Sequence, residues 1–438
     1  MLKNYKILII YFFLSGNIFA SDLTIFANAY IFSDSNNSNY NMNLKGQILN
    51  SSNASLLFGS SIIDSLRTSK VSVIKNSGNN ISLYELFHER KLKYGSIKFG
   101  KFALSDSNIY QNEISMGHPF ISNNSAPIWG VDFIQQYKIK DLLLSFNFYN
   151  GQISSLDKYL WNRDYSVNIQ TSYIDEPYIH TKSITLTKKI RKNLFSVKLN
   201  HGGIWGGTVD KNGRSTTYSK NLEAFKRIVL IRSGIKNSND SRPKIANQNG
   251  SIDFYLKRNN SVFYYINYFE DGSGKSFKNK LDGLWGFSYI KKNHKWLFEV
   301  LKTKNQSGNL HIMGKKSGVD SYYWHDQYVQ GWTIDGFSIG NYYISPNNNR
   351  KIVYRIGYSL ERERWNFKAK FDYMDTYPTY GAKKLPADYR FNKSIDNSFY
   401  SHLTYEFKLS NGLSISLESF SKDNQLMFGS KIFWNKIL

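Results

Sequence analysis

The sequence predicts an all-β protein: a transmembrane antiparallel β-barrel of about 18 strands in a bacterial outer membrane, with short periplasmic turns and long extracellular loops. Three observations lead to this prediction. The chain opens with an export signal, apolar and polar residues then alternate over many segments, and short connections alternate with long polar ones. Together they favour one closed sheet over the several soluble domains that a length of 438 residues would otherwise suggest.

Residues 1–20 have the pattern of a secretory signal peptide. Lys3 and Lys6 supply the positive end, residues 7–14 (ILIIYFFL) form the apolar stretch, and Ala20 is a small residue suited to cleavage. The apolar stretch is too short to cross a bilayer as a helix, which favours a signal over a retained anchor. The predicted organisation is therefore a signal peptide over 1–20 and an outer-membrane β-barrel over 21–438.

Composition narrows the class of protein further. After residue 20 no stretch approaches the ~18 to 20 apolar residues of a transmembrane helix. The chain has no cysteine, which excludes disulfides and thiolate metal sites. The net charge of +24 suggests an anionic partner, although compositional drift is the simpler alternative. Because the protein is predicted to be exported, nucleic acid is an implausible partner.

Alternation with a period of two residues is the strongest local signal. Over 365–374, for example, Trp365, Phe367 and Ala369 alternate with polar residues. Such runs approach the ~9 to 11 residues that a tilted strand needs to cross a bilayer. The ambiguous segment 70–77 (KVSVIKNS) is assigned to an outer loop. The predicted strands are 23–33, 40–49, 54–63, 81–91, 95–102, 131–138, 142–149, 180–190, 194–201, 250–257, 262–269, 284–291, 296–303, 352–361, 365–374, 398–409, 413–420 and 426–434.

The connections between these strands support a barrel. Short charged turns such as 138–141 and 191–193 alternate with long polar segments through the middle of the chain. A soluble β-sandwich or propeller has no reason to place every long loop on one side, whereas an outer-membrane barrel does. The long segments are 102–130, 150–179, 202–249, 270–283, 303–351 and 375–397.

One long loop is expected to enter the barrel. Segment 102–130 carries apolar side chains that are unfavourable in an exposed loop. A barrel of about 18 strands encloses a channel unless something fills it. The sequence therefore predicts that this loop folds inward, and the side chains concerned are Ile109, Tyr110, Met116, Phe120 and Ile121.

Five segments, in order along the chain, resemble the Wzi family of outer-membrane capsule-assembly proteins. They are 121–127 (ISNNSAP), 268–274 (YFEDGSG), 281–286 (LDGLWG), 299–308 (EVLKTKNQSG) and 320–341 (DSYYWHDQYVQGWTIDGFSIGN). The resemblance implies an eighteen-stranded, largely plugged barrel that acts as a surface lectin for capsular or related polysaccharide. The chain departs from the best-known members because no helical segment precedes its first predicted strand. The family-motif residues are Asn123, Asn124, Ala126, Pro127, Glu270, Asp271, Gly272, Asp282, Gly283, Asn305, Gln306, Ser307, Gly308, Gly331, Gly336 and Gly340.

The predicted outer loops contain residue types that suit a polysaccharide-binding surface. Tryptophan and tyrosine offer flat faces with a polar handle, and guanidinium groups pair bidentately with uronate carboxylates. The basic loop 202–249 could instead be simply solvated or bind lipopolysaccharide phosphates, and segment 320–341 could be a structural plug. The candidate polysaccharide-binding residues are Trp205, Arg214, Lys220, Lys226, Arg227, Arg232, Tyr322, Tyr323, Trp324, His325 and Trp332.

Catalytic and metal sites have weaker support. The carboxylates of 270–272 and 282–283 could hold Ca²⁺, but their spacing does not match an EF-hand loop and turn chemistry explains them better. His325 beside Asp326 lacks a nucleophile, and His402 with Thr404 lacks a serine motif. We therefore expect no catalytic residue, no metal and no cofactor.

These features predict a non-enzymatic outer-membrane lectin that binds exported polysaccharide and anchors or organises it at the cell surface. The alternative is a general or anion-preferring diffusion porin with loop 102–130 as its constriction. A barrel hydrolase of lipid or peptide would need a nucleophile and a base that the sequence does not offer. The expected partners are exported acidic polysaccharide, outer-membrane lipid and lipopolysaccharide, and the barrel-assembly machinery during biogenesis.

Overall fold

The computed structural model of the chain describes the barrel and parts of its loops. The signal peptide predicted over 1–20 and the strand predicted over 40–49 lie outside the described residues. The described residues are 22–32, 54–76, 81–104, 113–122, 125–153, 156–162, 169–211, 214–232, 246–270, 279–306, 322–323, 325, 328, 331–334, 337–344, 350–378, 394, 396–423 and 425–437.

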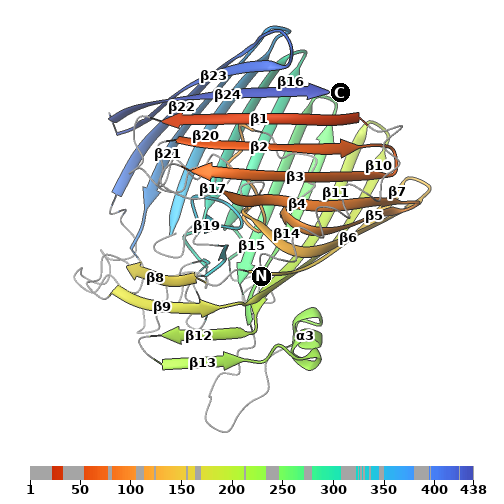
Figure 1. Ribbon diagram of the computed structural model, residues 1–438, viewed down its shortest axis with the longest axis vertical. Coiled ribbons are helices and arrows are strands. Elements are labelled where there is room, and N and C mark those ends of the chain that lie inside the picture. The colour runs from red at the N-terminus through yellow and green to blue at the C-terminus, as the bar shows by residue number, and fades with distance from the viewer. Residues whose placement is uncertain are drawn as a thin grey trace.

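Eighteen antiparallel strands of the described chain form one closed barrel (Figure 1). Each strand pairs with the next along the chain, and β1 pairs with β24 to close the sheet. Closure gives every edge a partner, which a sheet surrounded by hydrocarbon requires. The strands are β1 (Asp22–Phe32), β2 (Ala54–Ile63), β3 (Arg67–Asn76), β4 (Ser82–Leu92), β5 (Gly95–Ala103), β6 (Pro127–Ile139), β7 (Leu142–Gln152), β10 (Tyr178–Ile190), β11 (Asn193–Trp205), β14 (Ala246–Arg258), β15 (Ser261–Glu270), β16 (Gly283–Lys291), β17 (His294–Lys302), β20 (Lys351–Glu361), β21 (Trp365–Thr376), β22 (Asp396–Lys408), β23 (Leu413–Lys422) and β24 (Gln425–Ile437).

The two ends of the barrel differ in their connections. Thr24 near the start of β1 pairs with Ile437 at the end of β24. The first strand therefore begins, and the last strand ends, at the same rim of the barrel. Tight turns such as 140–141 and 191–192 lie at that rim, and the long connections lie at the other. This arrangement confirms the predicted short periplasmic turns and long extracellular loops.

The outer face of the barrel is apolar and its inner face is polar. On β20, Tyr354 and Ile356 point outward and are exposed, whereas Arg355 between them is buried. On β11, Val197 and Leu199 are exposed in the same way. Such a belt of exposed apolar side chains fits a lipid bilayer, and the chain is an outer-membrane β-barrel. None of the described helices is long and apolar enough to span a membrane.

One strand of the barrel was not predicted. Segment 70–77, expected in an outer loop, falls largely within β3, which pairs with β2 and β4. The outward positions Val71 and Val73 are flanked by lysines, so the local pattern is weak and pairing with two neighbours decides the outcome. β1 pairs directly with β2 along the described chain. Strand β6 also begins at Pro127, four residues before the predicted start at 131.

A small four-stranded sheet extends from the extracellular rim (Figure 1). Its middle strands continue the β10–β11 hairpin, because β9 leads into β10 and β12 follows β11. The two ribbons join at a bend where Glu176, Gly206 and Gly207 have positive φ. A side chain at Gly207 would contact the Asp175 carbonyl oxygen at 2.5 Å, so the bend needs a glycine there. The sheet order is β13 (Arg214–Tyr218), β12 (Gly207–Lys211), β9 (Ile169–Asp175) and β8 (Leu156–Asn162).

A short helix, α3 (Leu222–Val229), follows β13 and was not predicted. Asn221 caps its first turn by accepting a hydrogen bond from the Ala224 amide at 2.9 Å. The Phe225 ring packs edge-on against Phe148 of β7, which points outward between β6 and β10. The helix therefore lies on the outer wall of the barrel.

Candidate functional site: a plugged extracellular end

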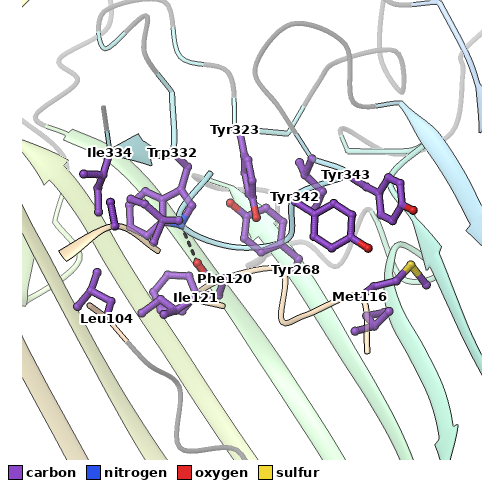
Figure 2. Packing of buried hydrophobic residues seen from close by; sticks show 14 of the residues in the cluster. Leu104, Met116, Phe120, Ile121, Tyr268, Tyr323, Trp332, Ile334, Tyr342 and Tyr343 are labelled. Atoms are coloured by element: carbon purple, nitrogen blue, oxygen red, sulfur yellow. Dashed lines mark hydrogen bonds between the residues drawn. The ribbon is translucent and has the colours of Figure 1, made fainter. Parts of the chain in front are cut away.

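Two loop segments fold into the barrel interior near its extracellular end. One is 113–122, between β5 and β6; the other is 322–344, between β17 and β20, which contains the short strands β18 (Thr333–Ile334) and β19 (Phe337–Ser338). We call their described residues the plug. The Trp332 indole donates a hydrogen bond to the Phe120 carbonyl at 2.7 Å, and the two rings stack (Figure 2). The predicted inward folding of loop 102–130 is confirmed for Met116, Phe120 and Ile121; Ile109 and Tyr110 lie outside the described residues.

Glu299 of β17 holds the first plug segment against the barrel wall. Its carboxylate accepts hydrogen bonds from the Ser115 hydroxyl at 2.5 Å, from the Met116 amide at 2.6 Å and from the Tyr264 hydroxyl. The Glu299 side chain is fully buried. Three donors compensate for its desolvation, so the contact orients the segment as well as attaching it.

His118 provides a second attachment. Its Nδ1 accepts a hydrogen bond from the Phe120 amide at 3.0 Å, so the proton lies on Nε2, which donates to Asp253 Oδ2 at 3.0 Å. Asp253 on β14 also accepts from Asn200 Nδ2 at 2.8 Å and from Ser251 at 2.6 Å. Both members of the pair are buried. The arrangement fixes one tautomer of the imidazole and one orientation of the loop.

Arg355 and Asp372 form the third attachment. Arg355 Nε donates to Asp372 Oδ1 at 2.6 Å, and Nη2 donates to Oδ2 at 2.5 Å, so the pair is bidentate. The Tyr343 hydroxyl of the plug donates to Asp372 Oδ2 at 2.5 Å, and the Tyr342 hydroxyl contacts Arg355. The second plug segment is thereby joined to β20 and β21.

Glu270 and Asp282, two predicted family-motif residues, hold the tyrosines at the start of the second segment. Asp282 Oδ2 accepts from the Tyr322 hydroxyl at 3.0 Å and from the Asn305 amide at 2.6 Å, while Glu270 accepts from the Tyr323 amide. Burial raises the pKa of Asp282 to about 7. Within the described residues no group of three or more His, Asp or Glu side chains is arranged to hold a metal ion.

The remaining family-motif positions divide into structural and undescribed ones. Gly340 packs against the Pro119 carbonyl and the Tyr323 hydroxyl, leaving no room for a side chain. Gly283 and Gly331 have positive φ. Gln306 donates weakly to Glu270 at 3.4 Å. Ala126 is buried, and Pro127 begins β6. Outside the described residues lie Asn123, Asn124, Asp271, Gly272, Ser307, Gly308 and Gly336.

Most aromatic residues predicted to bind polysaccharide are buried. Tyr322, Tyr323, His325 and Trp332 lie within the plug, and Trp205 packs beneath α3. These side chains present no open face, so an exposed sugar platform does not fit their positions. Their amphipathic character instead serves the plug, where each hydroxyl or indole NH needs a buried partner. Trp324 lies outside the described residues.

The predicted basic residues lie on the extracellular side, outside the plug. Lys220 is exposed, with its ammonium group 3.9 Å from Glu176 and 5.3 Å from the centre of the Tyr178 ring. Arg214 is the first residue of β13 in the small sheet. Lys226, Arg227 and Arg232 belong to α3 or directly follow it. The structure therefore separates the basic loop into a sheet part and a helix part.

His402 does not belong to the extracellular face. It lies on β22 with Nε2 3.1 Å from the Thr404 hydroxyl and 3.7 Å from Glu418, which pairs with Lys431 at 2.5 Å. These side chains form a charged network on the inner wall. No serine contact that would suggest a hydrolase accompanies His402 in the interactions found for the described residues.

The comparisons with known proteins support the fold. No family model and no curated protein matches the sequence. The structure is similar to that of Wzi from Escherichia coli, described as an outer membrane protein involved in group 1 capsule assembly and a carbohydrate-binding β-barrel. The TM-score is 0.62 at 12% identity, over 94% of this chain and 84% of Wzi. The expected resemblance to Wzi is thereby confirmed for the fold.

Weaker similarity extends to other outer-membrane barrels. OccD3 (OpdP) of Pseudomonas aeruginosa has a TM-score of 0.40 at 9% identity, over 97% of this chain and 93% of that protein. A mutant porin of Rh. blastica has a TM-score of 0.38 at 8% identity, over 95% and 100% of the two chains.

Proposed function

We propose that this barrel, which shares the fold of Wzi, is a non-enzymatic outer-membrane protein that binds exported acidic polysaccharide and holds it at the cell surface. The observation that carries the proposal is the plug. Its two segments are tied to β14, β15, β17, β20 and β21 by buried hydrogen bonds and charged groups. A lumen filled in this way favours a rigid extracellular binding face over an open channel.

The small sheet and the residues beside it supply the binding chemistry. Arg214 begins β13, Lys220 follows this strand, and the sequence of β8 includes Tyr159 and Trp161. Basic groups attract uronate or sulfate groups, and aromatic residues suit contact with sugar rings. The sheet joins the barrel through continuous strands, which gives a bound polymer a firm attachment to the membrane.

A diffusion porin is the rival function. It would need the plug to leave a passage or to move aside. The ties of the plug to Glu299, Asp253 and Asp372 oppose such movement, because breaking each one leaves a buried charge or polar group without its partner. Conductance in planar bilayers tests this point directly. Near-zero conductance supports the proposal, and stable stepwise channels would favour the porin.

Binding is tested with the purified full-length barrel in detergent. The probes are a polyuronate and a neutral dextran of the same length. The variant Arg214→Glu/Lys220→Glu should bind polyuronate at least about tenfold more weakly, or ~1.4 kcal/mol. The control Arg362→Glu/Lys291→Glu changes the same charge at the periplasmic rim and should bind normally. Absence of polyuronate binding by the unmodified barrel, or equal binding by both variants, contradicts the proposal.

A further inference from the structure

Helix α3 lies where the apolar belt of the barrel ends. On the outer wall, Ile184 of β10 and Leu199 of β11 are paired and exposed. The next outward pair toward the extracellular rim is Lys182 and His201, which are polar. This change from apolar to polar residues marks the outer boundary of the hydrocarbon layer on this side of the barrel.

The helix contacts the wall at that boundary. Its Phe225 ring lies 5.9 Å from His180, whereas the Val229 carbonyl accepts a hydrogen bond from Lys182 at 2.6 Å. Lys182 is two residues closer to the membrane than His180 along β10, or ~7 Å at the rise of a strand. The C-terminal end of α3 is therefore held at the level of Lys182, in the first polar pair beyond the apolar belt.

The helix exposes both apolar and basic side chains. Ala224 and Ile228 are buried against Trp205 and Ala246, which leaves the opposite side free. At the C-terminal end of the helix, Leu230 is 58% exposed and Ile231 is 45% exposed.

Basic side chains accompany this exposed apolar end. Lys226 and Arg232 are exposed there, and Arg227 is paired with Glu223 at 3.1 Å. Apolar side chains with basic neighbours are the composition of helices that lie in a membrane interface.

Ile231 also has an unfavourable backbone conformation. It has φ +56°, and the hydrogen bonds from its amide to Ile228 and from the Arg232 amide to Arg227 form a Schellman motif. Glycine normally occupies this position, because a β-branched residue is strained at positive φ. The chain thus places an exposed isoleucine where a glycine would be easier to fold.

We propose that the end of α3 is a binding site for a phosphate-bearing lipid of the outer leaflet, of the lipopolysaccharide type. Lys226 and Arg232 pair with headgroup phosphates, while Leu230 and Ile231 contact the upper part of the acyl chains. The site lies beside Lys182, one outward pair beyond the apolar belt at Ile184 and Leu199, and its charge is complementary to the phosphates. The polysaccharide proposed above binds elsewhere, on the small sheet.

Membrane contact is tested first. Because the chain has no cysteine, Ile231→Cys can carry a single environment-sensitive fluorophore. In bilayers with brominated acyl chains this label should be quenched at least twofold more than a label at Thr216→Cys in β13. Equal quenching at the two positions overturns the proposal.

The lipid headgroup is tested in nanodiscs. Barrels are exchanged into discs that contain bisphosphorylated lipid A, or lipid A without phosphates, and retention of the lipid is measured by mass spectrometry. Lys226→Ala/Arg232→Ala should retain the bisphosphorylated lipid at least fivefold less than the unmodified barrel. The matched control Lys291→Ala/Arg362→Ala should retain it normally. Equal retention of the two lipids by the unmodified barrel, or displacement by inorganic phosphate alone, contradicts a lipid site.

Two further measurements separate this site from the other functions. Ile231→Gly should remove the backbone strain and leave the thermal midpoint unchanged or higher, yet lower the retention of lipid. A variant with lower thermal stability and normal retention would show that Ile231 has only a structural role. Lys226 and Arg232 were candidate polysaccharide-binding residues, but they belong to the α3 region and not to the small sheet on which the polysaccharide is proposed to bind. Polyuronate binding by Lys226→Ala/Arg232→Ala should therefore remain normal, so a failure of the lipid site and a failure of polysaccharide binding give different results.

Discussion

Ser115 of the plug donates a hydrogen bond of 2.5 Å to Glu299 on the barrel wall, although the two residues are 184 positions apart in the chain. Contacts of this kind join loops between distant strands into one body inside the barrel. The plug therefore adds connections across the barrel, in addition to the pairing of neighbouring strands around it.

Removing the Glu299 carboxylate should loosen the plug. Glu299→Ala leaves the Ser115 hydroxyl, the Met116 amide and the Tyr264 hydroxyl without their buried acceptor, which costs about 1–3 kcal/mol for each group left unsatisfied. We expect Glu299→Ala to give transient conductance steps in planar bilayers, under conditions in which the unmodified barrel gives none. Glu299→Gln keeps an acceptor and should give fewer steps. Equal silence in both variants would show that the plug does not depend on this residue.

Removing one member of the Arg355–Asp372 pair should lower the free energy of unfolding more than replacing both members by apolar residues. Among the described residues, Arg355→Met leaves the buried Asp372 carboxylate with the Tyr343 hydroxyl as its hydrogen-bond donor, and the expected loss is about 3–5 kcal/mol in the free energy of unfolding. Arg355→Met/Asp372→Leu removes both charges and should lose less. Denaturant titration followed by tryptophan fluorescence checks this order, and additive losses would contradict it.

Asp282 should make the barrel less stable as the pH rises. Its pKa is about 7 in the folded protein, above the ordinary 3.8, so the folded state binds more protons than the unfolded state between these values. The free energy of unfolding should therefore fall from about pH 4 to about pH 7 and stay low above it. Each unit of pKa shift corresponds to about 1.4 kcal/mol. Asp282→Asn should reduce this slope when thermal midpoints at pH 5 and pH 8 are compared; an unchanged slope would assign it to other groups.

The Tyr264 ring needs the glycine opposite it. Gly286 on β16 pairs with Tyr264 on β15, and a Cβ atom at Gly286 would overlap the tyrosine ring. Gly286→Ala should displace Tyr264 from Glu299 and lower the thermal midpoint by several degrees. Gly203→Ala is the control, because its Cβ would lie 3.4 Å from the nearest atom, an ordinary contact distance. Heat-dependent mobility on gels distinguishes the two variants.

Strand positions were predictable from the sequence where inward and outward residues differ strongly. On β20, outward Tyr354 and Ile356 flank inward Arg355, and the alternation is visible in the sequence. On β3 the alternation is not visible in the sequence, because Lys70 and Lys75 interrupt the apolar positions. Segment 40–49 has the cleaner alternation but lies outside the described residues, among which β1 pairs directly with β2. Pairing between strands is a long-range property that a local pattern does not contain.

The candidate site was less predictable. The motif around Tyr322 and Trp332 was identified, but sequence alone left open whether these aromatic residues face a sugar or the interior. Their hydrogen bonds to Asp282 and Phe120 decide this, and both partners are distant in the chain. Helix α3 had a local signal that was missed. Asn221 is followed by apolar residues at helical spacing, but the surrounding basic loop concealed the pattern.

The continuity between the small sheet and the β10–β11 hairpin determines how the barrel would carry a mechanical load. A polymer that drags on β9 and β12 pulls along the strands that enter the wall. The hydrogen bonds that hold this hairpin in the wall, in the β7–β10 and β11–β14 ladders, run across that direction, so they share the tension in shear and do not break one after another. Deformation should therefore occur first at the bend near Gly206 and Gly207. This bend would act as a flexible hinge between a polymer bound to the small sheet and the barrel in the membrane.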